Sequence, residues 1–164
     1  MRIAILTIST AGAQGTRADT SGDAITAWAR ERRYAVAARE LVSDEVNAIV
    51  RQLLAWCDAG DADVVLTTGG TGLSPTDVTP EATRAVIERD APGISEWLRA
   101  SSVGKFPRAA LSRGISGVRN KTLIVNLPGS PGGVKDSLAA LEPIVEHAVA
   151  VMRGEVRDHA APTP

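Results

Sequence analysis

The sequence predicts an α/β fold in which helices cover both faces of a parallel or mostly parallel β-sheet. Two stretches, Ile3 to Ile8 and Asp63 to Thr68, are largely apolar runs typical of strands buried on both faces. Segments with helical spacing of apolar residues alternate with such strands along the chain. Strands joined through helices run parallel, and ligands bind these sheets beyond the carboxyl ends of the strands. A functional site is therefore expected in the loops that follow strands.

In the first half of the chain, the strand at Ile3 to Ile8 leads into a polar loop from Ser9 to Arg17. A helix is expected to begin near Asp19 to Ser21, because Ile25, Trp28 and Ala29 then share one face. A second strand is expected from Tyr34 to Val42. Ser43 is expected to open a second helix, and its apolar face would consist of Val46, Ile49, Val50, Leu53 and Leu54.

In the second half, the strand at Asp63 to Thr68 is followed by Thr79-Pro80-Glu81, the pattern of an N-cap, a first-position proline and a first-turn acid. Asp90 to Gly93 ends that helix, and the next one carries Ile94, Trp97 and Leu98. Short strands are expected at Leu111 to Val118 and at Thr122 to Leu127. A last helix follows Gly133, and Pro143 predicts a kink or a new helix start within it.

The composition bounds the class of protein. The chain has 164 residues, 44% hydrophobic and 23% charged, which fits one globular domain over residues 1–156 and a disordered tail at 157–164. A net charge of −1 argues against a broad surface for nucleic acid. No apolar run has the length of a signal peptide or a membrane span, so a cytoplasmic protein without a membrane partner is expected. The single cysteine, Cys57, excludes an internal disulfide and a zinc site of several thiolates.

Two glycine-rich loops follow predicted strands. Gly69, Gly70, Thr71 and Gly72 come directly after DVVLTT, and Pro128, Gly129 and Ser130 begin PGSPGG after TLIVNL. Glycines let the backbone approach a ligand and turn its N–H groups toward an anion, and Ser130 with Pro131 can cap a helix whose positive end faces the same way. Taken alone, GGTG is more often a tight turn than a phosphate site. Two such loops strengthen the case for one shared anion site.

Aspartates lie at three strand-to-helix junctions: Asp19 in DTSG, Asp44 in VSDE and Asp77 in SPTDVTPE. Carboxylates repel phosphates, so acids beside a phosphate site point to magnesium, which binds both kinds of oxygen. The alternative is a plain helix-start or turn acid. From the residues alone, that alternative is preferred for Asp19 and Asp44, whereas the two interpretations of Asp77 are balanced.

The segment TTGGTGLSPTDVTPEAT (Thr67 to Thr83), followed by NLPGSP (Asn126 to Pro131), closely resembles the molybdopterin adenylyltransferase family. This family includes bacterial Mog and MoaB proteins and the G domains of gephyrin and of its plant relatives. DTSG (Asp19 to Gly22) and VSDEV (Val42 to Val46) match as well, so the resemblance covers nearly the whole chain.

The resemblance implies a three-layer α/β/α sandwich, commonly a homotrimer, that converts Mg-ATP and molybdopterin into adenylyl-molybdopterin and pyrophosphate. Asp44 and Asp77 then resemble the catalytic and Mg²⁺-binding acids. Gly69 to Gly72 resemble the nucleotide-phosphate loop, and Pro128, Gly129 and Ser130 its second wall. The loop after the first strand, with Ser9, Asp19, Ser21 and Gly22, is expected as a third wall that holds the pterin. A MoeA-like molybdenum-insertion protein is a candidate partner.

Two features depart from the pattern of the active enzymes. Thr76 stands where several adenylyltransferases have a basic residue before the DVTPE aspartate, so one phosphate contact is either absent or supplied by another residue. The basic candidates are Arg17, Lys105, Arg108, Arg113, Lys121 and Lys135. The DTSG and GTGLSP motifs are more similar to those of MoaB proteins, some of which are inactive in adenylylation. The intact DVTPE motif, in contrast, favours adenylyl transfer. A non-catalytic MoaB-like pterin-binding protein and a CinA-like nucleotide pyrophosphatase therefore remain as alternatives.

Overall fold

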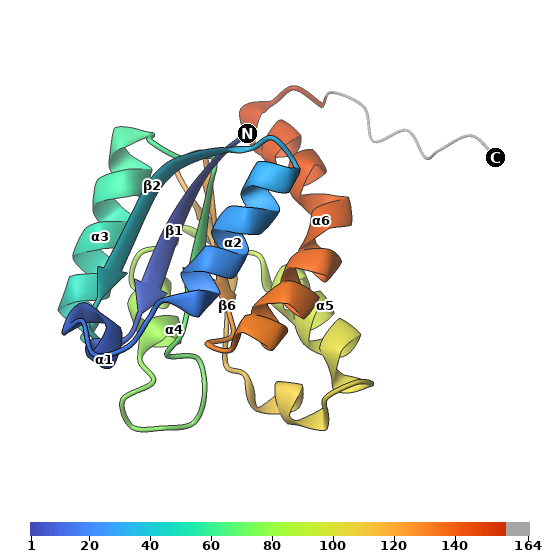
Figure 1. The fold of residues 1–164 in the computed structure, drawn as a ribbon. Helices are drawn as coiled ribbons and strands as arrows, with labels where there is room; N and C mark the ends of the chain where they lie inside the picture. Colours follow the sequence, from blue (N-terminus) through green and yellow to red (C-terminus); the bar gives the residue numbers. More distant parts are fainter. Residues whose placement is uncertain (157–164) are drawn as a thin grey trace.

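The computed structural model describes residues 1–156, which form a six-stranded sheet in the order β2-β1-β3-β6-β5-β4 (Figure 1). The tail predicted at residues 157–164 lies outside the described residues. Four neighbouring strands run parallel: β2 (Ala35–Val42), β1 (Arg2–Ile8), β3 (Val64–Thr68) and β6 (Thr122–Leu127). The next strand, β5 (Ser116–Arg119), is antiparallel to both of its neighbours, β6 and the edge strand β4 (Arg89–Asp90). The expectation of a mostly parallel sheet is confirmed.

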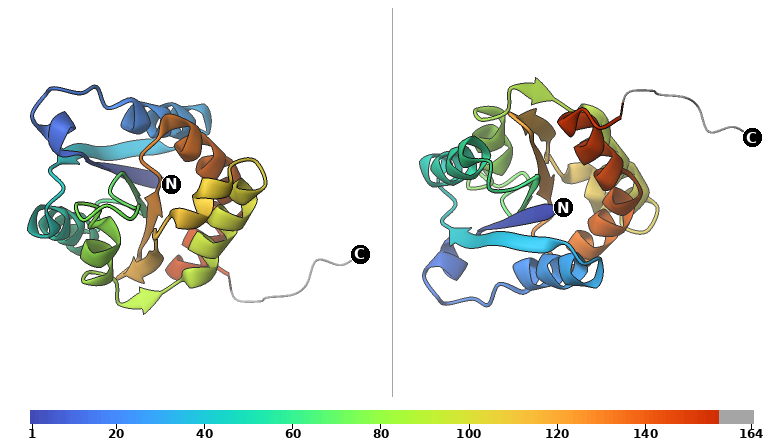
Figure 2. Two further views of the ribbon diagram at one scale, coloured as in Figure 1. Left: turned by 90° about the horizontal axis from the view of Figure 1, so that it is seen from below. Right: turned by 90° about the horizontal axis from the view of Figure 1, so that it is seen from above.

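Helices form a layer on each face of the sheet, as the views from the two ends show (Figure 2). On one face lie α2 (Thr20–Glu31), α5 (Pro92–Val103) and α6 (Pro131–Arg153), which share a hydrophobic core. On the other face lie α3 (Val46–Ala59) and α4 (Thr79–Arg84), which share a second core. The three-layer α/β/α sandwich is therefore confirmed.

Burial on both faces of the sheet explains why the sequences of the central strands lack an alternating apolar and polar pattern. In β1, Ile3 and Ile5 pack into the first core, while Ala4 and Leu6 pack into the second. All five residues of β3 are buried, and so are all six of β6. A strand covered on both faces must be apolar at nearly every position, as the continuous runs predicted.

The structure corrects three sequence-based expectations. The strand expected at 111–118 is confined to β5, because a 3₁₀ helix, η1 (Pro107–Leu111), occupies the preceding segment. The helix expected from Ser43 begins at Val46. Helix α6 continues through Pro143 without a new start. Pro143 has no N–H for the preceding turn, and near that turn the Ala140 carbonyl accepts a hydrogen bond from Trp97 Nε1 at 2.8 Å.

A short helix, α1 (Thr10–Ala13), lies in the loop after β1 that was expected to be only polar loop. Within residues 1–156, no helix combines the length and apolar character needed to span a membrane.

Candidate functional site

The two glycine-rich loops lie side by side at the carboxyl edge of the sheet, because β3 and β6 are paired neighbours. They approach so closely that a Cβ on Gly129 would stand 3.2 Å from the Gly69 Cα. Both loops line a cavity of about 720 Å³, which falls in the usual range for a small-molecule site. The prediction that the loops meet at one edge of the sheet is therefore confirmed.

The first loop needs glycine at its first two positions. Gly69 and Gly70 have φ angles of 98° and 63°, a region that favours glycine. A Cβ on Gly69 would stand 2.2 Å from the carbonyl oxygen of Ile8, an impossible contact. Thr79 closes the loop, because its Oγ1 donates to the Gly69 carbonyl at 2.8 Å and its N–H to the Gly70 carbonyl at 3.1 Å. Gly70, Thr71 and Gly72 then line the cavity.

The second loop ends at the start of α6, the longest helix of the described chain. Ser130 is its N-cap and accepts a hydrogen bond from the Gly133 N–H at 3.2 Å, with Pro131 at the first position. Pro128, Gly129 and Ser130 line the cavity together with Gly132 and Gly133. The positive end of the helix dipole therefore lies at the cavity.

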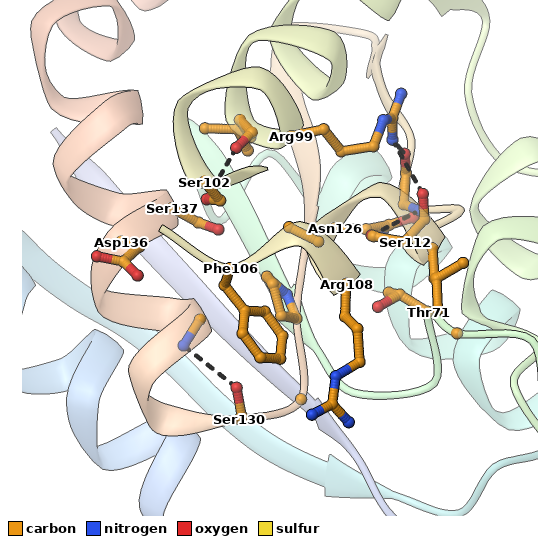
Figure 3. A pocket seen from close by; sticks show the side chains of 18 of the residues that line it. Thr71, Arg99, Ser102, Phe106, Arg108, Ser112, Asn126, Ser130, Asp136 and Ser137 are labelled. Atoms are coloured by element: carbon orange, nitrogen blue, oxygen red, sulfur yellow. Dashed lines mark hydrogen bonds between the residues drawn. The ribbon is translucent and has the colours of Figure 1, made fainter. Parts of the chain in front are cut away.

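The third side of the cavity is formed by α5 and η1, whereas the first-strand loop was expected to form it. Figure 3 shows Arg99, Ser102, Phe106 and Arg108 from this segment around the cavity. The loop with Ser9, Asp19, Ser21 and Gly22, expected as the third wall, is absent from the lining within residues 1–156. It lies behind the second loop instead, where Ser21 Oγ donates to the Gly129 carbonyl at 2.9 Å.

Three of these first-strand-loop residues have local structural contacts. Ser9 caps α1 and accepts the Gly12 N–H at 3.1 Å. Asp19 caps α2 by accepting the Gly22 N–H at 2.8 Å, and it also binds Thr7 Oγ1 and Arg39. A Cβ on Gly22 would stand 2.1 Å from the Asp19 carboxylate, so the glycine makes room for this cap.

Of the three predicted acids, Asp77 is the one that lines the cavity, which Asp136 of α6 also lines. One carboxylate oxygen, Oδ2, accepts the Ser74 N–H at 2.9 Å. Its other oxygen, Oδ1, has no hydrogen-bond partner within the described chain. A Cβ on Gly72 would stand 2.8 Å from Asp77 Oδ2, so the third glycine of GGTG makes room for the carboxylate.

Asp44 follows β2 at the same carboxyl edge, but β1 lies between β2 and β3. Its Oδ2 accepts hydrogen bonds from the Thr10 N–H at 2.7 Å and from Thr10 Oγ1 at 2.8 Å. Asp44 is not among the residues, all within 1–156, that line the cavity. Its role as a second catalytic or metal-binding acid stays a prediction.

The basic candidates separate into distinct groups. Lys105 and Arg108 line the cavity, and the Arg108 guanidinium lies 5.3 Å from the centre of the Phe106 ring. Lys121 belongs to a second hollow that also includes Arg2 and Arg153. Arg17 and Lys135 do not line the cavity formed within residues 1–156. Arg113 donates its hydrogen bonds to protein oxygens and lowers the pKa of Glu81 through its hydrogen bond to that carboxylate.

Sequence reasoning named Lys105 and Arg108 as basic candidates but missed the wall formed by α5 and η1, because it did not reveal β4, the two-residue strand that α5 follows. It also missed Asn126, whose amide Nδ2 donates to Thr67 Oγ1 and to Thr83 Oγ1, both at 2.9 Å. This buried side chain ties β6 to β3 and α4 below the cavity. The one signal for it was a polar residue inside an otherwise apolar strand.

The chain is similar to proteins of molybdenum-cofactor synthesis. Residues 4–147 match the family described as a probable molybdopterin binding domain. A protein named molybdopterin adenylyltransferase from Helicobacter pylori strain J99 is 38% identical over 94% of this chain and 89% of its own length. Its namesake from Escherichia coli K12 is 37% identical over 87% of this chain and 74% of its own length.

Solved structures give the same result. A structure titled molybdopterin biosynthesis enzyme MoaB, from Thermus thermophilus, has 48% identity and a TM-score of 0.88, covering 93% of this chain and 96% of its own. A Mog protein from Mycobacterium ulcerans has 41% identity and a TM-score of 0.87, covering 92% and 97%. A CinA protein from Thermoplasma acidophilum, 19% identical with a TM-score of 0.68 over 88% of this chain and 97% of its own, shares the fold alone.

Proposed function

The chain belongs to the molybdopterin-binding domain family, and we propose that it is a nucleotidyltransferase that moves the adenylyl group of ATP onto molybdopterin and releases pyrophosphate. The observation that carries this proposal is the single cavity in which two glycine-rich loops, a helix N-terminus and the Asp77 carboxylate meet. Adenylyl transfer depends on positioning and charge neutralisation and needs no protein nucleophile. This agrees with a site built from backbone groups, carboxylates and basic side chains.

The phosphates of ATP are assigned to the N–H groups of the two loops. Gly70 to Gly72 present backbone to the cavity, and the first turn of α6 presents the Gly132 N–H, which has no partner within residues 1–156. In the reaction, an oxygen of molybdopterin attacks the α-phosphorus while the bond to pyrophosphate breaks. Lys105 and Arg108 at the cavity are suited to bind the negative charge that moves onto the leaving group.

We include Mg²⁺ in the proposal because the free Oδ1 of Asp77 fits it. Mg²⁺ prefers carboxylate and phosphate oxygens and is commonly held by one or two carboxylates together with substrate phosphates. Bound there, it would neutralise phosphate charge. Asp44, at the same edge of the sheet, is proposed as the second acid. Within residues 1–156, no group of three or more His, Cys, Asp or Glu residues could hold a metal alone, so the substrate phosphates would complete the coordination.

The pterin is proposed to extend toward α5 and η1 rather than toward the first-strand loop, because that segment lines the remaining side of the cavity. We further propose that residues 1–156 act as one domain, that the protein is a cytoplasmic homotrimer, and that a MoeA-like insertion protein receives its product.

The proposal is tested by incubating the protein with molybdopterin and Mg-ATP and detecting adenylylated pterin and pyrophosphate. ATP consumption is expected to require both molybdopterin and Mg²⁺. Pyrophosphate release without molybdopterin would instead indicate the CinA-like nucleotide pyrophosphatase. Binding of molybdopterin without product would indicate the non-catalytic MoaB-like alternative.

A further inference from the structure

Arg113 contacts the loop that carries Asp77 at three places and the following helix α4 at one. It lies between η1 and β5, more than thirty residues beyond that loop in sequence. Its N–H donates to the Thr71 carbonyl at 2.8 Å, and its Nε donates to the Gly72 carbonyl at 2.7 Å. Its Nη2 donates to the Asp77 carbonyl, and both terminal nitrogens bind the Glu81 carboxylate.

These contacts hold the backbone at Gly72, which the Asp77 carboxylate approaches, and the backbone at Asp77 itself. Gly72 is the residue against which Asp77 Oδ2 packs, and its carbonyl is held by Arg113 Nε. The carbonyl of Asp77 itself is held by Arg113 Nη2. The intervening residues 73–76 are exposed, so little other packing restrains this part of the loop.

We propose that Arg113 is a positioning residue, which holds the segment from Thr71 to Glu81 in one conformation and thereby presents the Asp77 carboxylate to the cavity. The inference rests on the proposed function for its catalytic consequence, although the restraint on the loop can be measured without it. A planar guanidinium with five donors in a fixed fork suits this task, and a lysine ammonium cannot reproduce the set of contacts.

This role differs from a contact with substrate phosphate. A phosphate-binding arginine needs donors directed at the ligand, whereas the Nε, Nη1 and Nη2 of Arg113 are all directed at protein oxygens. Loss of Arg113 should therefore act through Asp77. A displacement of about 1 Å in a catalytic group can cost about a hundredfold in rate.

The test is a double-mutant cycle in the full-length protein. Arg113→Lys is expected to lower kcat by roughly 10- to 100-fold while KM for ATP changes by less than about threefold. In the Asp77→Asn background the same change should add almost no further loss, because its target is already removed. Additive losses, or a raised KM with unchanged kcat, would overturn the proposal in favour of direct substrate binding.

Arg119→Gln is the matched control. Arg119 also forms a two-point pair with a carboxylate, through Nε and Nη2 to Asp58 at 2.7 and 3.0 Å, but it lies outside the cavity lining formed within residues 1–156. Arg119→Gln should therefore leave kcat unchanged. A loss in this control equal to that of Arg113→Lys would overturn a specific role for Arg113.

Amide hydrogen exchange gives a readout that does not depend on turnover. The N–H groups of Ser74, Asp77 and Thr79 are hydrogen-bonded within the loop. They are expected to exchange at least about tenfold faster in Arg113→Lys and in Arg113→Gln, with the core amide of Val65 unchanged. If the wild-type protein makes no adenylyl-molybdopterin, the proposed function fails, yet this measurement still decides the inference. Unchanged exchange in both variants would overturn it.

Discussion

At the scale of single residues, the candidate site depends on side chains with different tasks in one loop. Asp77 presents an oxygen to the cavity, Gly72 makes room for that carboxylate, and Thr79 closes the loop beneath it. Asp19 carries the same functional group but places it in a helix cap and an arginine pair. The partners of a carboxylate, rather than its presence beside a glycine motif, therefore separate a candidate catalytic acid from a structural one.

The first prediction concerns Asp77. Asp77→Asn keeps the shape of the side chain and removes its charge, so Mg²⁺-dependent turnover should fall at least about a hundredfold, on the order of 3 kcal/mol of transition-state stabilisation. Steady-state rates with molybdopterin and Mg-ATP measure this. Asp61→Asn, at an exposed position before β3, is the control and should keep full activity. Equal rates for Asp77→Asn and the wild type would remove Asp77 from the mechanism.

The second prediction concerns Cys57, whose thiol is buried, with the residue only 1% exposed. Burial raises the pKa of the thiol to about 11, so very little thiolate exists near neutral pH. A thiol-labelling reagent at pH 8 should therefore react at least about a hundredfold more slowly with the native protein than with the urea-unfolded chain. Glutathione at the same pH calibrates the reagent. Similar rates for native and unfolded protein would contradict the burial of this thiol.

At the scale of elements, Asp63 joins three parts of the chain at the amino edge of the sheet. Immediately before β3, it accepts the Arg2 N–H from β1 at 2.6 Å and binds the Arg2 side chain at 2.9 Å. Arg153, at the end of α6, lies 2.8 Å from the same carboxylate. The carboxylate is thus buried, charged and paired, an arrangement in which loss of one partner is costly.

The third prediction follows from the pKa of Asp63. Burial alone would raise the pKa of this carboxyl, but the hydrogen bonds from Arg2 and Arg153 outweigh it and lower the pKa to about 2. The ion pairs therefore stabilise the folded state fully above the unfolded pKa near 4, and this stabilisation is lost as the pH falls toward 2. Asp63→Asn should lower the free energy of unfolding by about 2 kcal/mol at pH 7 and by much less near pH 2.5.

Urea unfolding at the two pH values measures this difference. Asp90→Asn is the control, because its pair with Arg84 is 3.5 Å long and its side chain is 62% exposed. Such an exposed pair is expected to contribute less than about 1 kcal/mol at either pH. An Asp63→Asn effect that stays the same at both pH values would show that packing, not charge, gives Asp63 its role.

At the scale of the whole molecule, the sequence predicted those features that follow from strand order and failed where packing decided. Apolar runs revealed β1 and β3, and β6 was expected as a short strand. The rule that parallel strands end at one edge then placed Gly70 and Gly129 together. No local pattern indicates that α5 and η1 fold over that edge, because Phe106 and Arg108 reach the cavity through the packing of α5 on α6. Pro143 within α6 is a second case, since the helix continues through a residue that usually ends or kinks helices.

The last prediction concerns assembly. Trp97 on α5 is 50% exposed, a large apolar surface that a monomer would leave in water. Closure of a symmetric oligomer would bury such a surface, and the proposed homotrimer should sediment at three times the 17.1 kDa mass of the chain at micromolar concentration. Trp97→Glu should lower the sedimenting mass if α5 lies in the interface. Val46→Glu, at another exposed apolar position on α3, is the matched control and should leave that mass unchanged. A wild-type protein that sediments as a stable monomer would contradict the trimer, and an unchanged trimer in Trp97→Glu would place the interface away from α5.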